Sequence, residues 1–524
     1  MSLMKIKDFD KVTIKSGLKV MGKEAFILLT ILDFVFSDCI MDLMSQLDDE
    51  FDSSVGRPCY PRALLLGILL YCFKRKITKI SDIVLECKTN RVLRVFTRKI
   101  EPSATTFKRF LENSSPEIMR KVFLYTLVVL NDYEFLKFIK AFIDGTDALV
   151  RGSRYYTINK DIIKSMKWMK KCGLLHNNRK ISMERTRKKL EEMRGYNNGN
   201  KEFNKMLDLI LNNLKIYNKN VYKKIPEFEA IMEERNIDYV SITFPSSVMM
   251  KTKKGRYDFA FNLQEIITEN DIVITGVLVS KPNDFKVLPN VIRELERNFE
   301  ILIQLQKKYG ERRNYKEIAN MIKNAKYICD SGYFTDENLE YMDKHGYKCI
   351  IMTKNRAKQI NNETRKKNNI TKKKKDSKYN HVKRIKNGLQ CEKGNIIELK
   401  EVIQVKHHKN IREGIDNSWK EHRYIFRCED CKYCPNSKIC NFEEVTITTT
   451  PLKYDMENLF CDEDILELYL ERFHHSEFIN GDLKGNDGTL LLPGHNKTAV
   501  NNTVHLLNAV FNVFRHKNLK GTIY

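Results

Sequence analysis

The sequence predicts an α/β protein in which a mixed sheet is flanked by helices. An all-helical N-terminal domain precedes this core, and a helical insertion and a Cys-containing insertion interrupt it. Two observations carry the prediction: residues 1–135 space their apolar residues as helices do, and from residue 136 onwards short apolar runs typical of buried strands alternate with helices and with charged segments. At 524 residues the chain is too long for one ordinary core, so two or three domains are expected.

The N-terminal domain, residues 1–135, is predicted to contain short helices joined by tight turns. PRALLLGILLYCFKR (61–75) begins with Pro, which is favoured at a helix start, and residues 79–96 continue with helical spacing. PSATTFKRFLENS (102–114) is typical of a capped helix and carries Lys108 and Arg109. This arrangement fits a helix-turn-helix that binds DNA through Lys108 and Arg109, and it fits a plain helical bundle equally well.

The predicted core is assembled from several separate segments. FIKAFIDGT (138–146) has the pattern of a buried strand that stops at Asp144-Gly145, and AKYICDSGYF (325–334) is a second apolar run that ends at Asp330. The other core elements are an expected hairpin at 257–267 and 271–280, a helix at 289–310, a helix at 336–345 and a strand at 347–354. The resulting division is 136–157 first part of the core, 158–236 helical insertion, 237–353 core continued, 354–462 basic and Cys-cluster insertion, and 463–524 C-terminal core helices.

Basic residues outnumber acidic ones, 92 Lys and Arg against 67 Asp and Glu, which gives a formal net charge of +25. Such an excess suits a polyanionic partner, and nucleic acid is the usual one. Residues 354–387 hold 14 Lys or Arg and only two acids, Glu363 and Asp376. We expect an exposed arm there that contacts DNA phosphates without sequence preference, and a solvated insertion with no ligand gives the same pattern.

Membrane and secretory signals are not expected in this sequence. The apolar run at 63–73 is too short to cross a bilayer, and the N-terminus lacks an apolar core followed by a cleavage site. We therefore expect a cytoplasmic protein, in which the 13 Cys are thiols or metal ligands rather than disulfides.

Four thiols lie within one short segment, CEDCKYCPNSKIC, as Cys428, Cys431, Cys434 and Cys440. In a reducing compartment this spacing predicts a metal site, and a structural Zn²⁺ is the first choice because its tetrahedral thiolate sites use such spacings. An iron–sulfur cluster is the rival, since Cys-x2-Cys-x2-Cys also occurs there, and unligated thiols are the third interpretation.

The segment YLERFHHSEFINGDLK (469–484) carries Tyr469, Arg472, Glu477 and Lys484. On a helix Glu477 and Lys484 point the same way because they are seven residues apart, whereas Arg472 lies about 140° from Glu477. An ordinary solvated amphipathic helix gives the same spacing.

Asp144, Asp330 and Glu477 together match one chemistry. Cleavage or transfer at a DNA phosphodiester needs a nucleophilic oxygen to be activated and a leaving oxygen to be stabilised. Two Mg²⁺ ions about 3.5–4 Å apart do both, and carboxylates hold them. Taken singly, acids at strand ends are common turn formers or helix caps.

At these residues the sequence resembles the DDE transposases of bacterial insertion sequences, whose catalytic domain has an RNase H-like fold. The resemblance extends over most of the chain. Its segments are 56–73 and 102–110, similar to the N-terminal helical domain; FIDGT (142–146), the first catalytic motif; YDFAFNLQ (257–264), the second strand; CDSGYF (329–334), the second acid motif; and 469–484, the Tyr-Arg-Glu-Lys signature. Four residues separate Arg472 from Glu477, as in a sister group, whereas the commonest form has three.

The resemblance implies roles for individual residues. Asp144, Asp330 and Glu477 would bind the two Mg²⁺ ions. Arg472 and Lys484 would contact DNA near the scissile phosphate, with Tyr469 as a supporting contact. The implied activity is Mg²⁺-dependent strand cleavage and strand transfer.

The expected partners are the element's terminal inverted repeats and target DNA, bound by a homodimer, with no membrane partner and a nucleoid-associated location in a bacterial cytoplasm. Two rival functions stay open at this point: an RNase H-like nuclease that cuts without joining, and a non-catalytic DNA-binding protein derived from a transposase.

Overall fold

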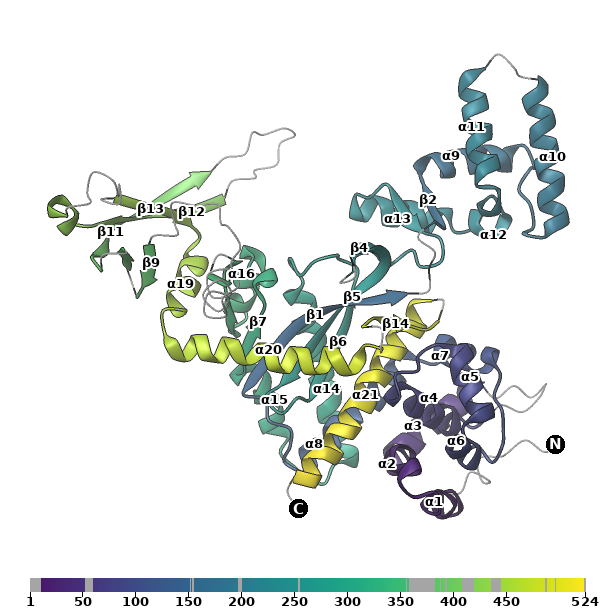
Figure 1. The fold of residues 1–524 in the computed structure, drawn as a ribbon, viewed down its shortest axis with the longest axis horizontal. Coiled ribbons are helices and arrows are strands. Elements are labelled where there is room, and N and C mark those ends of the chain that lie inside the picture. The colour runs from purple at the N-terminus through teal and green to yellow at the C-terminus, as the bar shows by residue number, and fades with distance from the viewer. Residues whose placement is uncertain are drawn as a thin grey trace, which may run out of the picture.

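The chain folds into a helical N-terminal region, a central mixed sheet and two peripheral insertions (Figure 1). This computed structural model describes residues 11–51, 60–150, 152, 155–196, 200–252, 255–354, 356–357, 382–386, 388–391, 394–407, 419–434, 444–485, 488–494 and 496–522. The predicted fold class, a mixed sheet flanked by helices with helices at the N-terminus, is confirmed. Among the described residues, none of the helices combines the length and the apolar composition that a membrane span requires.

The N-terminal region is a bundle of short helices. They are α1 (Lys11–Lys19), η2 (Gly22–Ala25), α2 (Phe26–Val35), α3 (Asp38–Phe51), α4 (Arg62–Lys74), α5 (Ile80–Thr89), α6 (Arg91–Phe96), α7 (Ala104–Asn113) and α8 (Pro116–Asp132). Helix α4 is buried along nearly its whole length because it is apolar on every side and other helices pack around it. The helical spacing predicted over 79–96 corresponds to two helices, because the side chain of Asn90 caps α6 by accepting a hydrogen bond from the Leu93 amide.

The central sheet has seven strands, β1 (Lys140–Val150), β4 (Val248–Lys251), β5 (Tyr257–Thr268), β6 (Val273–Val279), β7 (Lys326–Cys329), β8 (Lys348–Ile351) and β14 (Leu490–Leu492). The path through it is β4-β5-β1-β7-β8, with β6 paired to β5 and β14 paired to β1. Strands β5 and β6 form the predicted antiparallel hairpin, while β7 and β14 run parallel to β1. Helices α14 (Leu288–Tyr309), α15 (Tyr315–Asn324), η4 (Ser331–Tyr333) and α16 (Asp336–Lys344) connect these strands.

Strand β1 is longer than predicted. The prediction that it stops at Asp144-Gly145 is wrong, because Asp144 lies inside the strand and the chain continues extended to Val150. Pairing explains this: β5 follows β1 from Ala141 to Leu149, and the last residues of β1 also pair with β14. Strand pairing at both edges therefore overrides the turn-forming tendency of Asp-Gly.

The first insertion is a small helical unit with an apolar core of its own (Figure 1, top right). Its elements are β2 (Thr157–Asn159), α9 (Lys160–Lys171), α10 (Lys180–Tyr196), α11 (Lys201–Asn212), η3 (Leu214–Ile216), α12 (Lys219–Tyr222), α13 (Ile225–Arg235) and β3 (Tyr239–Ser241). Strands β2 and β3 pair with each other, so the chain leaves and re-enters the core at neighbouring points.

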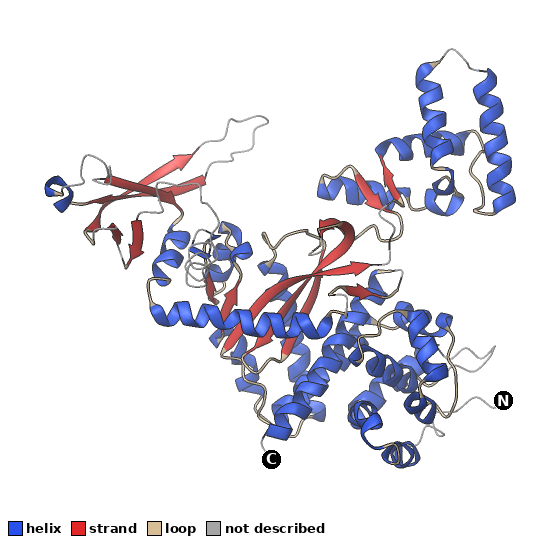
Figure 2. Cartoon of the chain, viewed as in Figure 1, coloured by secondary structure: helices blue, strands red, loops and turns tan. Residues whose placement is uncertain are grey.

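The second insertion contains a five-stranded antiparallel sheet that sequence reasoning missed (Figure 2, left). Its strands are β9 (Val382–Ile385), β10 (Gly388–Cys391), β11 (Ile396–His407), β12 (Trp419–Arg427) and β13 (Glu444–Thr449), and η6 (Asp430–Tyr433) follows β12. Residues 355, 358–381 and 387 of the predicted basic arm lie outside the described residues.

Three helices complete the chain: α19 (Pro451–Leu459), α20 (Glu463–Leu483) and α21 (Lys497–Thr522). Helix α20 begins as predicted near Glu463, because Asp462 caps it by accepting a hydrogen bond from the Asp464 amide. It crosses the sheet against β1, β7 and β8 (Figure 1). Helix α21 packs between the sheet and the N-terminal bundle, where the Asn502 side chain donates hydrogen bonds to the carbonyls of Leu111 and Ser114.

Candidate active site

The parallel register of β1 and β7 brings Asp144 and Asp330 together. Ile143 of β1 is paired with Cys329, the last residue of β7. The next residue of each strand is therefore one of the two aspartates, at the point where β7 leaves the sheet. Farther along the same edge of β1, Ala148–Val150 pair with β14, so Asp144 lies between two paired segments. This is the sheet-end position at which ligands and catalytic groups gather in open α/β sheets.

Arg472 of α20 lies between the two aspartates. Its Nη1 is 3.6 Å from Asp144 Oδ1, and its Nη2 is 3.5 Å from Asp330 Oδ1. The Arg472 side chain is only 7% exposed, and its guanidinium also lies 4.7 Å from the centre of the Phe473 ring. Burial alone would lower the pKa of Arg472, but the charges of Asp330 and Asp144 outweigh burial and raise it. The guanidinium is therefore a permanent cation that neutralises part of an acidic site.

The Asp144 carboxyl is unfavourable as an anion in this position. Burial raises its pKa from 3.8 to about 6; Arg472 opposes that rise, and the nearby charges of Asp330 and Asp284 add to it. Asn480, two turns of α20 beyond Arg472, donates a hydrogen bond of 3.1 Å to Asp144 Oδ2. Both oxygens of Asp144 thus face groups on α20, and the carboxyl gains from any further cation that approaches.

Asp284, in the loop after β6, is a third acid at the site that sequence reasoning missed. Its Oδ1 accepts hydrogen bonds from the side-chain amides of Asn262, at 3.0 Å, and Gln264, at 2.8 Å. Two glycines leave room for it: a Cβ on Gly145 would lie 2.7 Å from Asp284 Oδ1, and a Cβ on Gly332 would lie 3.0 Å from Asp284 Oδ2. Glycine is therefore required at these two positions of the predicted acid motifs because a larger side chain would collide with Asp284.

Asn262 and Gln264 were the available signal for Asp284. They lie two residues apart in β5 and so point to the same face of the sheet, and both are buried. Buried amides on one face of a strand need hydrogen-bond partners, so a polar group packed on that face of the sheet could have been expected. The Tyr333 hydroxyl donates to the Gln264 amide oxygen and completes the network.

A buried acid, Glu265, lies directly opposite Asp144 across β1 and β5. Burial raises its pKa from 4.5 to about 8, with Asp144 adding to the rise and Asn508 and Lys484 opposing it. Lys484 is buried as well, and its Nζ lies 3.9 Å from Asp147 Oδ1. The lysine of the predicted signature therefore contacts the sheet in this structure.

The remaining signature residues differ in their positions. Tyr469 is buried, and its ring centre lies 5.6 Å from the Arg472 guanidinium. Glu477 is on α20 but is exposed, one position past the buried Ser476. Glu477 and Lys484 were predicted to share a helical face; Lys484 is the residue after the end of α20 at Leu483, and it is buried whereas Glu477 is exposed.

The structure thus brings together Asp144, Asp330 and Arg472 of the predicted site, whereas Glu477 is exposed on α20. Within the described part of the chain, no three His, Cys, Asp or Glu side chains are grouped so that they could hold a metal ion. Of the predicted thiol cluster, Cys428 is buried and Cys434 is half-buried, and both are free thiols. Cys440 and the side chain of Cys431 lie outside the described residues.

Comparison with protein families gave one match. Residues 27–113, from α2 to the end of α7, match the family described as Transposase domain (DUF772). This match supports a transposase role. Comparison with curated proteins and with solved structures gave no match.

The transposase-domain match includes the two predicted DNA-binding residues of the N-terminal region. Lys108 and Arg109 both lie on α7, where Arg109 is exposed and Lys108 is half-buried. The Ser103 hydroxyl caps this helix by accepting a hydrogen bond from the Thr106 amide, which confirms the predicted capped helix. DNA contact by either side chain stays a prediction.

Proposed function

We propose that this chain is a DNA transposase of the DDE type, with an RNase H-like core that cleaves DNA and joins the cut strand to a target in the presence of Mg²⁺. One observation carries the proposal. Asp144 and Asp330 meet at the end of β7 and share a buried arginine, in a chain whose N-terminal helices match a transposase domain. An acidic centre at a sheet edge is the arrangement that metal-dependent phosphoryl transfer requires.

The side chains at this centre fit a divalent cation in part. Asp144 and Asp330 supply carboxylate oxygens, which Mg²⁺ prefers. Burial and two neighbouring acids raise the pKa of Asp144, and a bound cation would relieve that cost. When bound, the metal ions would activate the attacking oxygen and stabilise the leaving oxygen.

Two residues are candidates for the third protein ligand of the metal ions. The family resemblance assigns this role to Glu477, which is exposed on the same helix that carries Arg472. The alternative is Asp284, which lies next to Gly145 and Gly332 and helps to raise the pKa of Asp144, although the three aspartates are not grouped as one metal site in this structure. Glu477 remains our first assignment, and Asp284 is the alternative to be tested beside it.

The chain's own groups would position the DNA strand and the acids. Arg472 is a cation with two donor nitrogens directed at the aspartates, and it would hold a phosphate that enters between them. Asn480 would keep the Asp144 carboxyl in a fixed orientation by its hydrogen bond. Lys484 and Tyr469 would support this arrangement from positions packed in the protein, next to the sheet and next to Arg472.

Other parts of the proposal concern partners and metal. Lys108 and Arg109 would contact the terminal inverted repeats, the basic segment 354–387 would contact DNA without sequence preference, and the active unit would be a homodimer on DNA. A structural Zn²⁺ at the four clustered thiols would appear as about one equivalent of metal in the purified protein, lost when Cys428 or Cys434 is changed to Ser.

The decisive assay for function incubates the protein with Mg²⁺, labelled DNA carrying the element ends, and a target plasmid. A transposase converts the labelled ends into joined products. A nuclease of the same fold releases cut strands that stay unjoined, and a DNA-binding descendant shifts the substrate in a gel but leaves it intact. Either of the last two results would overturn the proposal.

A further inference from the structure

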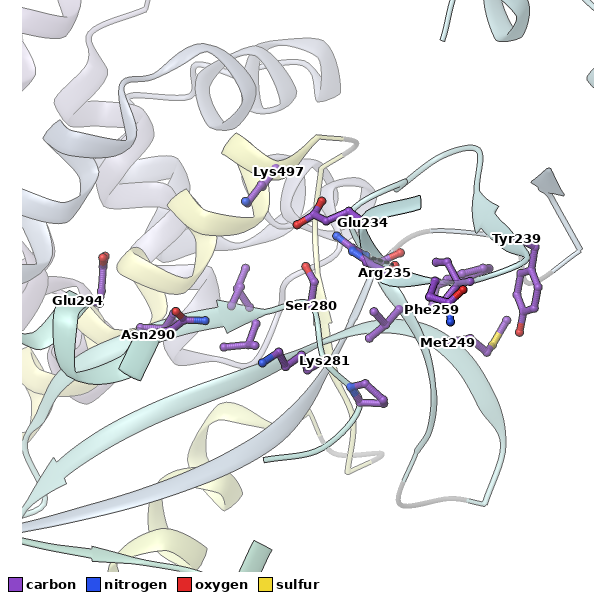
Figure 3. Close-up of a pocket in the computed structure, with 18 of the residues that line it drawn as sticks. Glu234, Arg235, Tyr239, Met249, Phe259, Ser280, Lys281, Asn290, Glu294 and Lys497 are labelled. Carbon is purple, nitrogen blue, oxygen red and sulfur yellow. Dashed lines mark hydrogen bonds between the residues drawn. The ribbon is translucent and has the colours of Figure 1, made fainter. Parts of the chain in front are cut away.

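A large hollow lies beside the edge of β6 that is unpaired within the described residues, and its lining includes neither Asp144 nor Asp330 (Figure 3). It measures about 1210 Å³ and is formed by the end of α13, strands β4 to β6, the start of α14 and the first residue of α21. This exceeds the range of roughly 300–1,000 Å³ that is usual for small-molecule pockets. The size favours part of a polymer as its occupant.

Four cations that line the hollow have no carboxylate partner within the described residues: Arg235, Lys281, Arg293 and Lys497. Three of them donate hydrogen bonds to neutral oxygens. Arg235 donates to the carbonyls of Ser246 and Ser247, Lys281 to the carbonyl of Lys286, and Arg293 to the Pro289 carbonyl and the Asn290 side chain.

The acids of the same hollow are largely compensated. Glu294 forms an ion pair with Arg120, and Asp238 lies 3.9 Å from Lys160. Glu234 is next to Arg235 in the chain and raises the pKa of that arginine, but burial outweighs it, so that the Arg235 pKa is lowered. A half-buried guanidinium held by carbonyls alone gains from an anionic partner. The net character of the hollow is therefore cationic.

One end of the hollow is aromatic and apolar. Figure 3 shows Tyr239, Met249 and Phe259 at that end, and Arg235 and Lys281 nearer the middle. Tyr239 is 43% exposed, so its ring is free to contact a ligand. Cations that follow a backbone, combined with an exposed aromatic ring that stacks on a base, are the usual composition of sites for single-stranded nucleic acid.

We propose that this hollow binds a short single-stranded segment of DNA, with its phosphates on Lys281, Arg293, Lys497 and Arg235 and a base stacked on Tyr239. The inference rests on the proposed function, because it supplies a path for a strand separated during cleavage. It names a second contact surface, apart from the acidic centre.

The test is a binding experiment that needs no catalysis. The variant Lys281→Gln/Arg293→Gln/Lys497→Gln is compared with a control, Arg187→Gln/Lys316→Gln/Lys344→Gln, which removes the same charge from exposed helical positions outside the hollow. Anisotropy of a labelled oligothymidylate is measured as a function of salt. The hollow variant should bind at least tenfold more weakly at low salt, with a salt slope smaller by about two, as expected for three phosphate contacts on a single strand. Equal affinity of the two triple variants would overturn the proposal.

Tyr239 provides a second, independent measurement. Tyr239→Ala should weaken single-strand binding by roughly fivefold or more, whereas Tyr239→Phe should bind normally because it keeps the ring. A strand containing 5-iododeoxyuridine should photo-crosslink to Tyr239 in the wild-type protein. A phosphate track for duplex alone predicts that Tyr239→Ala leaves binding unchanged and that no crosslink forms, and this would overturn the single-strand assignment.

Failure of this inference can be told apart from failure of the proposed function. If the hollow variant binds normally while Asp144→Asn loses cleavage, the hollow inference falls and the transposase proposal stands. If Asp144→Asn cleaves normally while the hollow variant loses single-strand binding, the proposed role of the acidic centre in cleavage falls. The assignment of single-strand binding to the hollow then stands.

Discussion

Arg472 Nη1 lies 3.6 Å from Asp144 Oδ1, and this ion pair joins helix α20 to the central strand of the sheet. The same guanidinium reaches Asp330 on the next strand. Because Arg472 is buried, removing either its charge or the two carboxylates would leave a buried charge without a partner. The contact therefore links the stability of the core to the chemistry proposed for it.

Arg472→Gln should destabilise the protein. It leaves two acids beside each other without their cation, and a loss of about 1–3 kcal/mol is expected, less than for a fully buried pair because water reaches Asp330 and partly Asp144. Arg472→Lys keeps the charge and should recover a large part of the loss. Urea unfolding at neutral pH measures both variants. A glutamine variant as stable as the wild type would show that the pair contributes nothing.

The metal-free protein should lose stability as the pH rises through weakly acidic values. The folded-state pKa of Asp144, about 6, is above its ordinary value of 3.8, so the folded protein binds more protons than the unfolded chain between these values. The free energy of unfolding should therefore fall between about pH 4 and pH 6, by on the order of 2–3 kcal/mol. Asp144→Asn should abolish this part of the pH dependence.

Glu265 should extend the same trend to higher pH. Its pKa is raised from 4.5 to about 8, so the free energy of unfolding should fall further as the pH rises between those values. Glu265→Gln should be more stable than the wild type at pH 8 and similar to it at pH 4. Glu340→Gln, an exposed change on α16, is the matched control and should leave the profile unaltered. A Glu265→Gln profile parallel to that of the wild type would contradict the burial argument.

Gly145→Ala should disturb the acidic centre. The added Cβ would lie 2.5 Å from Gln264 Nε2 and 2.7 Å from Asp284 Oδ1, so the hydrogen-bonded amides must shift. We expect a loss of about 1–3 kcal/mol and reduced cleavage. Gly481→Ala on α20 is the control, since its Cβ meets no atom within 4 Å, and it should be neutral or slightly stabilising. Equal behaviour of the two alanine variants would show that Asp284 needs no such space.

Two acids of the candidate site could be predicted from sequence because their positions follow from strand order. Asp330 follows the parallel strand β7, whose last residue pairs with Ile143, and it therefore comes close to Asp144 inside β1. The length of β1 could not be predicted, since it depends on pairing with β14, which is about 340 residues away in the sequence.

The orientation of α20 could not be predicted from its charged residues. The helix buries Leu468, Tyr469, Ile479 and Leu483, and this apolar face sets its rotation, which turns Arg472 inward and leaves Glu477 exposed. Asp284 was missed because it lies in a loop, where no periodicity marks a functional residue. The sheet of the second insertion was missed because a shift in register between Leu399 and Glu401 interrupts the alternation of polar and apolar residues in Ile396–His407.

The third metal ligand is tested by comparing two variants. If Glu477 is the ligand, Glu477→Gln should lower cleavage and joining by several orders of magnitude while binding to element ends survives, because the carboxylate charge holds the metal. Asp284→Asn should then reduce activity only mildly. The opposite ranking, with Glu477→Gln near the wild-type rate, would assign the role to Asp284. Strand cleavage in Mg²⁺ beside a gel shift on the same DNA gives both readouts.

The most direct test of the account is Mg²⁺-dependent strand cleavage by Asp144→Asn on DNA that carries the element ends. The substitution keeps the size of the side chain and removes the charge that a metal ion requires. The account predicts a fall of several orders of magnitude with unchanged gel-shift affinity, while Asp343→Asn, an exposed control on α16, cleaves normally. Cleavage by Asp144→Asn at the wild-type rate would contradict the account and remove the acidic centre from the reaction.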